Sequence, residues 1–199
     1  MPPPKQRTPE LGDRILAVAV DALAADGVAG LTARRVAREA GTSTPAVYEL
    51  FGDKGGLVRA IFFEGFRLLR RHLDRTVPAE AGPEALRQIA FALRSFISHN
   101  AELSRVMFER PFADFDPGPD DLAAGAAVRE FIVDRVRSCA AAGDIAGDPA
   151  DIAHVLIGLA LGLAAQESAG WLGTSAASAD RRWSVGVDAL IEGLGRREP

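Results

Sequence analysis

The 199-residue sequence contains a single cysteine, Cys139, and only three histidines. One cysteine cannot form an internal disulfide, which excludes a disulfide-stabilised scaffold, and it cannot supply a cysteine-based zinc site. A lone thiol fits a reducing compartment, so we expect a cytoplasmic protein in which Cys139 faces a helical core. The histidines lie far apart and lack the spacing of paired metal ligands. We therefore expect no metal and no cofactor.

The sequence also lacks the motifs of common enzymes and any long hydrophobic run. It has no nucleophile elbow and no phosphate-binding loop, so an all-helical enzyme stays only as a rival interpretation. The polar start, Met1–Pro9, does not resemble a signal peptide. The apolar run Ile152–Ala165, interrupted only by His154, is shorter than the ~20 residues that span a bilayer. It predicts a helix buried on all sides, one of them by a partner subunit, and no membrane partner.

The charge is distributed unevenly along the chain. The formal net charge is −4, which does not suggest a nucleic-acid-binding protein. Residues 1–60, however, carry eight Lys/Arg and seven Asp/Glu, whereas the remainder carries fifteen and twenty. A small DNA-binding domain needs a local basic surface and not a basic total. The charge pattern therefore permits DNA binding by the N-terminal part without demonstrating it.

Apolar residues recur at helical spacing, and no segment shows sustained strand-like alternation. The sequence predicts an all-α fold of about nine helices, with an N-terminal three-helix helix-turn-helix domain and a C-terminal helical domain. Caps and glycines place the predicted helices near Pro9–Asp26, Ala33–Ala40, Thr44–Phe51, Lys54–Thr76, Leu86–Ile97, Glu102–Glu109, Leu122–Ala142, Pro149–Gly170 and Ala177–Gly195. The proline-rich stretch Arg110–Asp121 predicts a loop or a broken helix.

The segment from Leu31 to Phe51 has the pattern of a helix-turn-helix. Ala37 and Ala40 are small enough for the second and third helices to approach closely. Gly41 can supply the positive φ that a sharp turn requires. The third helix begins with small residues, so its N-terminus can enter a major groove about 12 Å wide.

Residues 31–57 resemble the DNA-binding domain of the TetR family. The resemblance is carried by Thr32, Val36, Ala37, Ala40, Gly41, Ser43, Val47, Tyr48, Phe51, Lys54 and Leu57. Thr42 departs from the pattern, because the family usually has an aliphatic residue there, and Gly55 and Gly56 are expected to loosen the start of the fourth helix. The resemblance implies a dimeric transcription regulator, with a DNA-binding domain over residues 1–54 and an effector-binding and dimerisation domain over residues 55–199.

The resemblance also assigns roles in binding double-stranded operator DNA. Tyr48, Lys54 and Thr32 match positions that contact backbone phosphates, which fix the register of the protein. Bases are expected to be read at the start of the third helix, where methyl groups suit thymine, and a nearby arginine is expected to reach a guanine or a phosphate. These residues are Thr44, Pro45, Ala46 and Arg34, and Ser43 beside them is a further DNA-binding candidate. Arg7 is a weaker candidate for the minor groove, and Arg35 and Arg38 fit a solvated helix face equally well.

Aromatic and flexible side chains gather around the loop-rich middle of the chain. They predict a pocket for a small apolar effector whose binding releases a repressor from DNA, although activation stays open. The candidate ligand-binding residues are Phe96, His99, Leu103, Met107, Phe108, Phe112 and Phe131. The alternative is an ordinary hydrophobic core in which His99 and His154 are structural histidines.

The last two helices are the predicted homodimer interface. Gly158 and Gly162 permit close helix approach, and an apolar stripe follows from Trp183 through Leu194. The alternative for this stripe is a core within one chain. The second rival interpretation is a helical lipid-binding or scaffold protein that does not bind DNA. Tyr48 and Lys54 disfavour it, because the packing of the helices requires neither residue.

Overall fold

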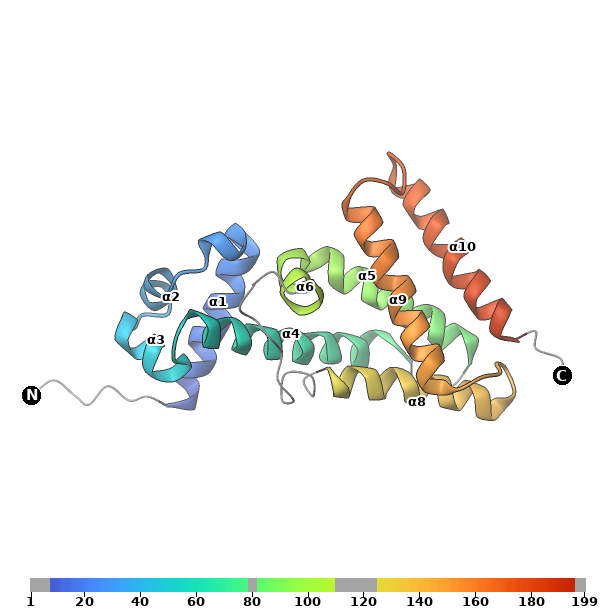
Figure 1. The fold of residues 1–199 in the computed structure, drawn as a ribbon, viewed down its shortest axis with the longest axis horizontal. Helices are drawn as coiled ribbons and strands as arrows, with labels where there is room; N and C mark the ends of the chain where they lie inside the picture. Colours follow the sequence, from blue (N-terminus) through green and yellow to red (C-terminus); the bar gives the residue numbers. More distant parts are fainter. Residues whose placement is uncertain (1–7, 79–81, 110–124, 196–199) are drawn as a thin grey trace, which may run out of the picture. The chain divides into compact units, whose positions relative to one another are not determined.

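The structure is a computed structural model that describes residues 8–78, 82–109 and 125–195 (Figure 1). These ranges hold nine helices and no strand, which confirms the predicted all-α fold. The helices are α1 (Pro9–Gly30), α2 (Ala33–Glu39), α3 (Thr44–Phe51), α4 (Lys54–Thr76), α5 (Pro83–His99), α6 (Ala101–Phe108), α8 (Ala126–Ala142), α9 (Pro149–Ser168) and α10 (Ala176–Gly195). The predicted loop over 110–121 lies outside the described residues.

The chain divides into two compact units. Unit 1 comprises residues 1–67 and 100–124, and unit 2 comprises residues 68–99 and 125–199. Helix α4 therefore contributes residues to both units. The functional division between residues 54 and 55 stays a prediction, because compactness does not test where DNA binding ends.

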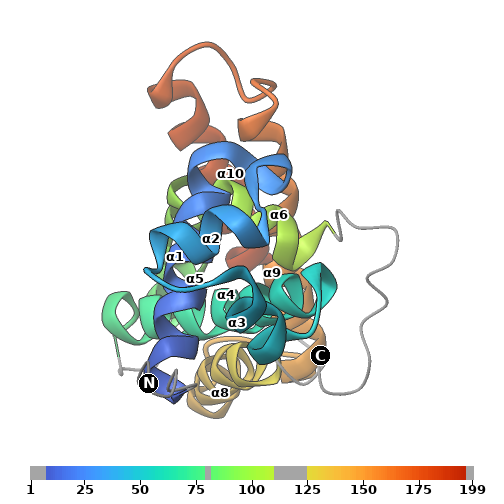
Figure 2. The ribbon, with the colours of Figure 1, turned by 90° about the vertical axis from the view of Figure 1, so that its left-hand side faces the viewer.

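Unit 1 is built around α1, whose N-terminus forms as its sequence predicts. The Thr8 side chain accepts a hydrogen bond from the N–H of Leu11 (3.4 Å), and Pro9 occupies the first turn. Gly27 has φ +63° and breaks the helical backbone, as predicted, although one further turn reaches Gly30. Figure 2 shows α1 together with the two short helices that pack near it. The buried side chains of α1, α2 and α3 include Ile15, Ala19, Leu23, Val36 and Val47.

The turn between α2 and α3 is a Schellman motif. The N–H of Thr42 donates to the carbonyl of Ala37 (2.8 Å), and the N–H of Gly41 donates to the carbonyl of Arg38 (3.2 Å). Gly41 has φ +64°, a left-handed conformation that costs glycine little. The turn therefore ends α2 sharply, and α3 begins three residues later at Thr44.

The junction between α3 and α4 depends on a second close approach. Gly52 ends α3 with φ +79°, and the carboxylate of Asp53 accepts the N–H of Gly56 (2.8 Å). A Cβ atom on residue 56 would overlap the carbonyl oxygen of Phe51. Gly56 thus allows α4 to begin directly behind α3, which replaces the prediction that the two glycines only loosen this helix end.

Unit 2 is a helical bundle in which α5 packs against α8, α9 and α10. Its core includes Ile89, Leu93, Ile132 and Leu156, each at most 2% exposed. Cys139 is fully buried, as predicted. Burial raises the pKa of its thiol, so the group stays protonated and packs as a small apolar side chain.

Helix α9 is apolar, but it is not buried on all sides within the chain. Ile152, Ala153 and Ala160 face the core, whereas Val155 is 53% exposed. By length and composition, α9 is the one helix in the described ranges that could cross a membrane, and 28% of its most apolar window is buried. A single such helix is weak evidence for a membrane protein. The exposed apolar side leaves room for the partner subunit that the sequence predicts on one side of this helix, and that partner stays a prediction.

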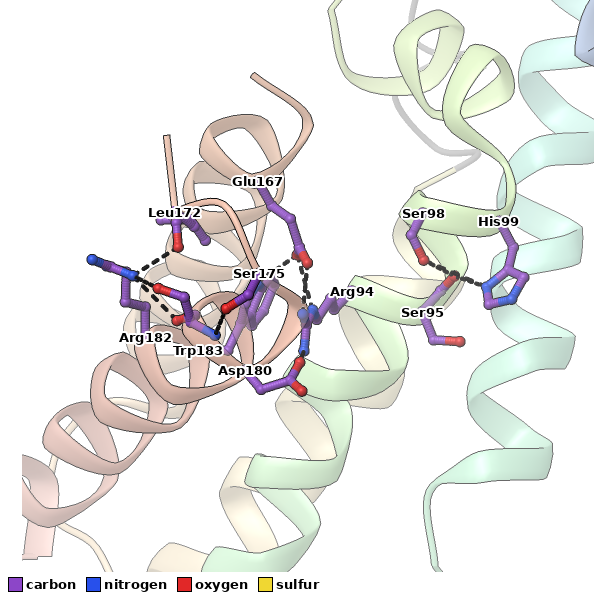
Figure 3. Close-up of polar contacts among 11 residues, drawn as sticks. Arg94, Ser95, Ser98, His99, Glu167, Leu172, Ser175, Asp180, Arg182 and Trp183 are labelled. Carbon is purple, nitrogen blue, oxygen red and sulfur yellow. Dashed lines mark hydrogen bonds and ion pairs between the residues drawn. The ribbon is translucent and has the colours of Figure 1, made fainter. Parts of the chain in front are cut away.

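Ion pairs and an indole fasten α5, α9 and α10 together (Figure 3). The guanidinium of Arg94 on α5 donates to both carboxylate oxygens of Glu167 on α9 (2.9 and 2.6 Å) and pairs with Asp180 on α10 (2.7 Å). The indole Nε1 of Trp183, a fully buried side chain, donates to Glu167 (2.8 Å). A bidentate, partly buried pair of this kind is stronger than an exposed one.

We expect Gly56→Ala to destabilise the protein by about 1–3 kcal/mol, because the added methyl group overlaps backbone that must move. Gly55→Ala is the matched control, since its Cβ meets only the flexible Asp53 carboxylate at 3.2 Å. Alanine at that position should be neutral or stabilise the helix by up to about 1 kcal/mol. Urea unfolding followed by circular dichroism compares the two variants. Equal stabilities would contradict the close approach.

We expect Glu167→Gln to lower the free energy of unfolding at neutral pH by about 1–3 kcal/mol. Arg94 foremost, and then Trp183, lower the pKa of Glu167. Because its folded pKa lies below the unfolded one, the carboxylate stabilises the fold above the ordinary glutamate pKa. This contribution disappears as the pH falls through the folded pKa. Urea unfolding across this pH range should show the two proteins converging in acid. The exposed Glu130→Gln is the control, and a pH-independent difference would contradict the expectation.

Candidate functional site

The three predicted phosphate contacts of unit 1 are exposed to solvent. Tyr48 on α3 is 47% exposed although it is aromatic, and Lys54 is exposed as the first residue of α4. Thr32 is the exposed N-cap of α2, and its hydroxyl accepts the N–H of Arg35 (3.3 Å). Lys54 and Thr32 thus stand at helix N-termini, where backbone N–H groups favour a phosphate.

The residues of α3 that are predicted to read bases lie at its start, and all of them except Ala46 are at least partly exposed. Ser43 is the N-cap of α3, Ser43 and Thr44 are half-buried, and Pro45 is exposed in the first turn. Ala46 is only 4% exposed, so its methyl group belongs to the core of unit 1. Burial corrects the assignment of Ala46 as a base-contacting residue.

The arginines of α2 separate into paired and open side chains. Arg35 forms ion pairs with Asp26 and, at 3.0 Å, with Glu39. These pairs raise the pKa of Arg35 and hold its side chain against unit 1, Glu39 having the larger effect. Arg34 is exposed, as the predicted contact with DNA requires. Arg38 is 75% exposed even though it pairs with Glu39 at 3.3 Å. Arg7 lies outside the described residues.

The predicted effector-binding residues fall into both compact units. Leu103 and Met107 are buried on α6 of unit 1, and Phe108 on that helix is half-buried. Phe96 and Phe131 are buried in unit 2. Phe112 lies outside the described residues. The candidate residues are therefore described within two separate units, and a common effector pocket stays a prediction.

Two histidines proposed as polar contacts lie on the surface. His99 is exposed at the end of α5, and its Nδ1 lies 2.7 Å from the carbonyl oxygen of Ser95 one turn earlier (Figure 3). His154 on α9 makes the same contact with the carbonyl of Ala150 (2.7 Å). Both contacts fit the alternative of a structural histidine, and a contact between His99 and an effector stays a prediction.

A hollow of about 370 Å³ in unit 2 combines aromatic and charged groups that the sequence pattern did not link. The guanidinium carbons of Arg70 and Arg135 lie 4.4 and 4.8 Å from the ring centroid of Phe131. Arg70 also pairs with Asp74 (2.9 Å), whereas the buried Nε of Arg135 has no hydrogen-bond partner. Residues from α4 and α8 meet here through tertiary packing, so no local sequence signal could have found the site.

His72 on α4 is a second group that the effector prediction missed. Its ring lies 5.9 Å from that of Phe96, and its buried Nε2 has no hydrogen-bond partner. Burial lowers the pKa of His72, which favours the neutral ring near pH 7. The nearby positive charge of Arg75 lowers it further. The Nε2 atom is closed off from solvent, so it could meet a bound molecule only if neighbouring side chains moved.

Family profiles match most of the chain. Residues 15–61 match the profile of the bacterial regulatory proteins of the tetR family, and residues 86–190 match the profile of the tetracyclin repressor-like C-terminal domain. No curated protein matches the chain in a sequence search. The two profile matches cover α2 and α3 and most of unit 2.

Solved structures share the whole fold. A protein of unknown function from Rhodococcus sp. RHA1 is 30% identical, with a TM-score of 0.81 over 98% of this chain and 100% of that chain. ActR of Streptomyces coelicolor bound to (S)-DNPA is 22% identical, with a TM-score of 0.61 over 92% and 95%. A TetR variant from Acinetobacter baumannii AYE bound to minocycline is 18% identical, with a TM-score of 0.61 over 92% and 94%.

Both halves of the chain therefore carry the same assignment, the N-terminal half by its helix-turn-helix and the C-terminal half by its helical bundle. The chain belongs to the TetR family of transcription regulators, and it is a DNA-binding regulator and not an enzyme.

Proposed function

We propose that the protein is a homodimeric repressor that places α3 of each subunit in the major groove and is released from operator DNA by a small molecule bound in unit 2. The observation that carries the proposal is the exposure of Tyr48 and Lys54 beside the open start of α3. The core does not need Tyr48 or Lys54, because both side chains are exposed. A phenol hydroxyl and an ammonium at these positions could instead bind backbone phosphates of DNA.

The proposed contacts with DNA divide by chemistry. Tyr48, Lys54 and Thr32 bind phosphates and position the protein, and this binding does not depend on sequence. Thr44 and Pro45 offer apolar groups to thymine methyls, and Arg34 reaches a guanine or a phosphate. Two such α3 helices must match half-sites about 34–36 Å apart or multiples of that distance.

We expect Tyr48→Phe and Lys54→Met each to weaken binding to all duplex sequences. Each removes one phosphate contact, and the loss of the lysine should reduce the slope of log K against log salt concentration by about 1. Fluorescence anisotropy with a duplex selected from a random library, and with mixed-sequence DNA, measures both quantities. Arg129→Met removes one exposed charge from α8 and is the control. If it lowers the affinity as much as Lys54→Met, the assigned face is wrong.

The effector is proposed to bind in unit 2, in the hollow where Phe131 offers a ring and Arg70 and Arg135 offer polar groups. The ligands bound to ActR and to the TetR variant support a small molecule in this fold. Helix α4 carries Lys54 at one end and Arg70 near the other, so a tilt of α4 would change the separation of the paired α3 helices. Compounds that saturate unit 2 but leave operator affinity unchanged would contradict release.

The homodimer is proposed to form through the exposed sides of α9 and α10. Val155 on α9 and Val185 on α10 are 53% and 63% exposed, and Gly158 and Gly162 have open space where a side chain would stand. Gly186, next to Val185, faces α9. These groups give an apolar surface that a two-fold related copy could cover.

Part of the predicted apolar stripe of α10 packs within unit 2, whereas Leu190, Ile191 and Leu194 are half-buried. Trp183 and Val187 are fully buried within the chain, which supports the alternative of an intrachain core for these two residues. The proposed interface therefore uses the neighbouring, exposed side of α10.

We expect Val185→Asp to raise the dissociation constant of the dimer by about tenfold or more, because two-fold symmetry buries the new charge twice. Ala17→Asp adds the same charge at an exposed position of α1 and should leave the dimer intact. Sedimentation velocity across a concentration series measures the constant. If Val185→Asp and Gly158→Glu both stay dimeric, the interface lies elsewhere.

A further inference from the structure

We infer that Arg14 of α1 is a positioning residue for DNA recognition, fixing the end of α2 and thereby the place where α3 begins. The inference rests on the proposed contacts of α3 with DNA. Arg14 was not among the residues that sequence reasoning assigned to the site, since it lies on an exposed side of α1, before the helix-turn-helix.

The contact is a hydrogen bond between parts of unit 1 that are far apart in sequence. The Nε of Arg14 donates to the carbonyl oxygen of Ala40 at 3.0 Å, and the bond is partly buried. Ala40 is the C-cap residue of α2 and is itself 3% exposed. Carbonyls at a helix C-terminus lack partners within the helix, and a cation there also meets the negative end of the helix dipole.

The neighbouring carbonyls of α2 are satisfied in another way. The N–H groups of Gly41 and Thr42 take the carbonyls of Arg38 and Ala37. The backbone turn and Arg14 therefore both end α2, and Arg14 also joins that end to α1 by a hydrogen bond. Deleting the guanidinium would leave the Schellman turn with its own hydrogen bonds but without this anchor.

The anchor matters for recognition because of where it acts. Ala40 immediately precedes Gly41, the residue with the left-handed backbone, and Thr44 begins α3 three residues after that. Contacts with base edges demand a placement within about 0.5 Å, whereas long phosphate-binding side chains tolerate more. Loss of the anchor should therefore weaken specific binding more than non-specific binding.

The test compares Arg14→Met, which keeps an unbranched apolar stem, with Arg14→Lys, which keeps a charged donor. Both are measured in the full-length protein, on the selected duplex and on mixed-sequence DNA over a range of salt concentrations. We expect Arg14→Met to lose about tenfold in affinity for the selected duplex and about threefold or less for mixed-sequence DNA. Its salt slope should stay unchanged, and Arg14→Lys should recover part of the loss.

Lys54→Met is the matched control, because the loss of a phosphate contact reduces the salt slope by about 1. If Arg14→Met reduces the slope as Lys54→Met does, Arg14 binds phosphate and the inference is wrong. The inference is also wrong if Arg14→Met leaves the affinity for both DNAs unchanged. It is wrong as well if the affinity falls equally for both DNAs and the unfolding midpoint of the variant is lower. If the unmodified protein shows no salt-dependent binding to either duplex, the proposed DNA contacts themselves fail, which is a separate result.

Discussion

The left-handed backbone at Gly41 is the constraint on which the DNA-binding face depends. At φ +64°, it lets α2 stop within one residue and α3 start at Thr44, so that Val47 turns inward while Tyr48 stays outside. A side chain in this conformation would cost free energy that a unit of short helices has little capacity to offset. Arg14 adds a second restraint on the same turn from α1. In the proposed mode of binding, recognition therefore depends on a turn that is held on two sides, because this turn sets where α3 begins.

Local signals were sufficient to predict the helices of unit 1, whereas its DNA-binding residues stay a prediction. Thr8, Gly27, Thr32 and Gly41 act where capping and glycine rules put them. Those rules could not decide which small residue of the eight-residue α3 faces inward. Ala46 and Val47 are adjacent and both buried. A helix of only two turns is too short for its sequence periodicity to show which of its small residues are exposed. The hydrogen bond from Arg14 to Ala40 was equally out of reach, because it joins segments 26 residues apart.

Unit 2 shows where apolar periodicity stops being informative. A stripe such as Trp183 and Val187 looks the same whether it packs within a chain or against a second copy. In the structure, the buried indole of Trp183 donates to the carboxylate of Glu167, which also pairs with Arg94. Trp183 therefore packs in the core of its own chain. The effector prediction stays untested, but apolar periodicity could not show what surrounds its candidate residue Phe131. The guanidiniums of Arg70 and Arg135 both face the ring of Phe131. A site at this ring is therefore partly charged, whereas composition alone suggested an apolar pocket.

Helix α4 is the element through which the proposed effector response has to act. Its 23 residues make a rod of about 34 Å, with Lys54 at its start and Arg70 beside the Phe131 hollow. A rod of that length turns a tilt of about 5° into a displacement of about 3 Å at its end. That exceeds what contacts with base edges tolerate, whereas flexible phosphate contacts could follow it in part. An effector of this kind would therefore reduce specificity before it abolished binding, so release from an operator could leave the protein still attracted to DNA in general.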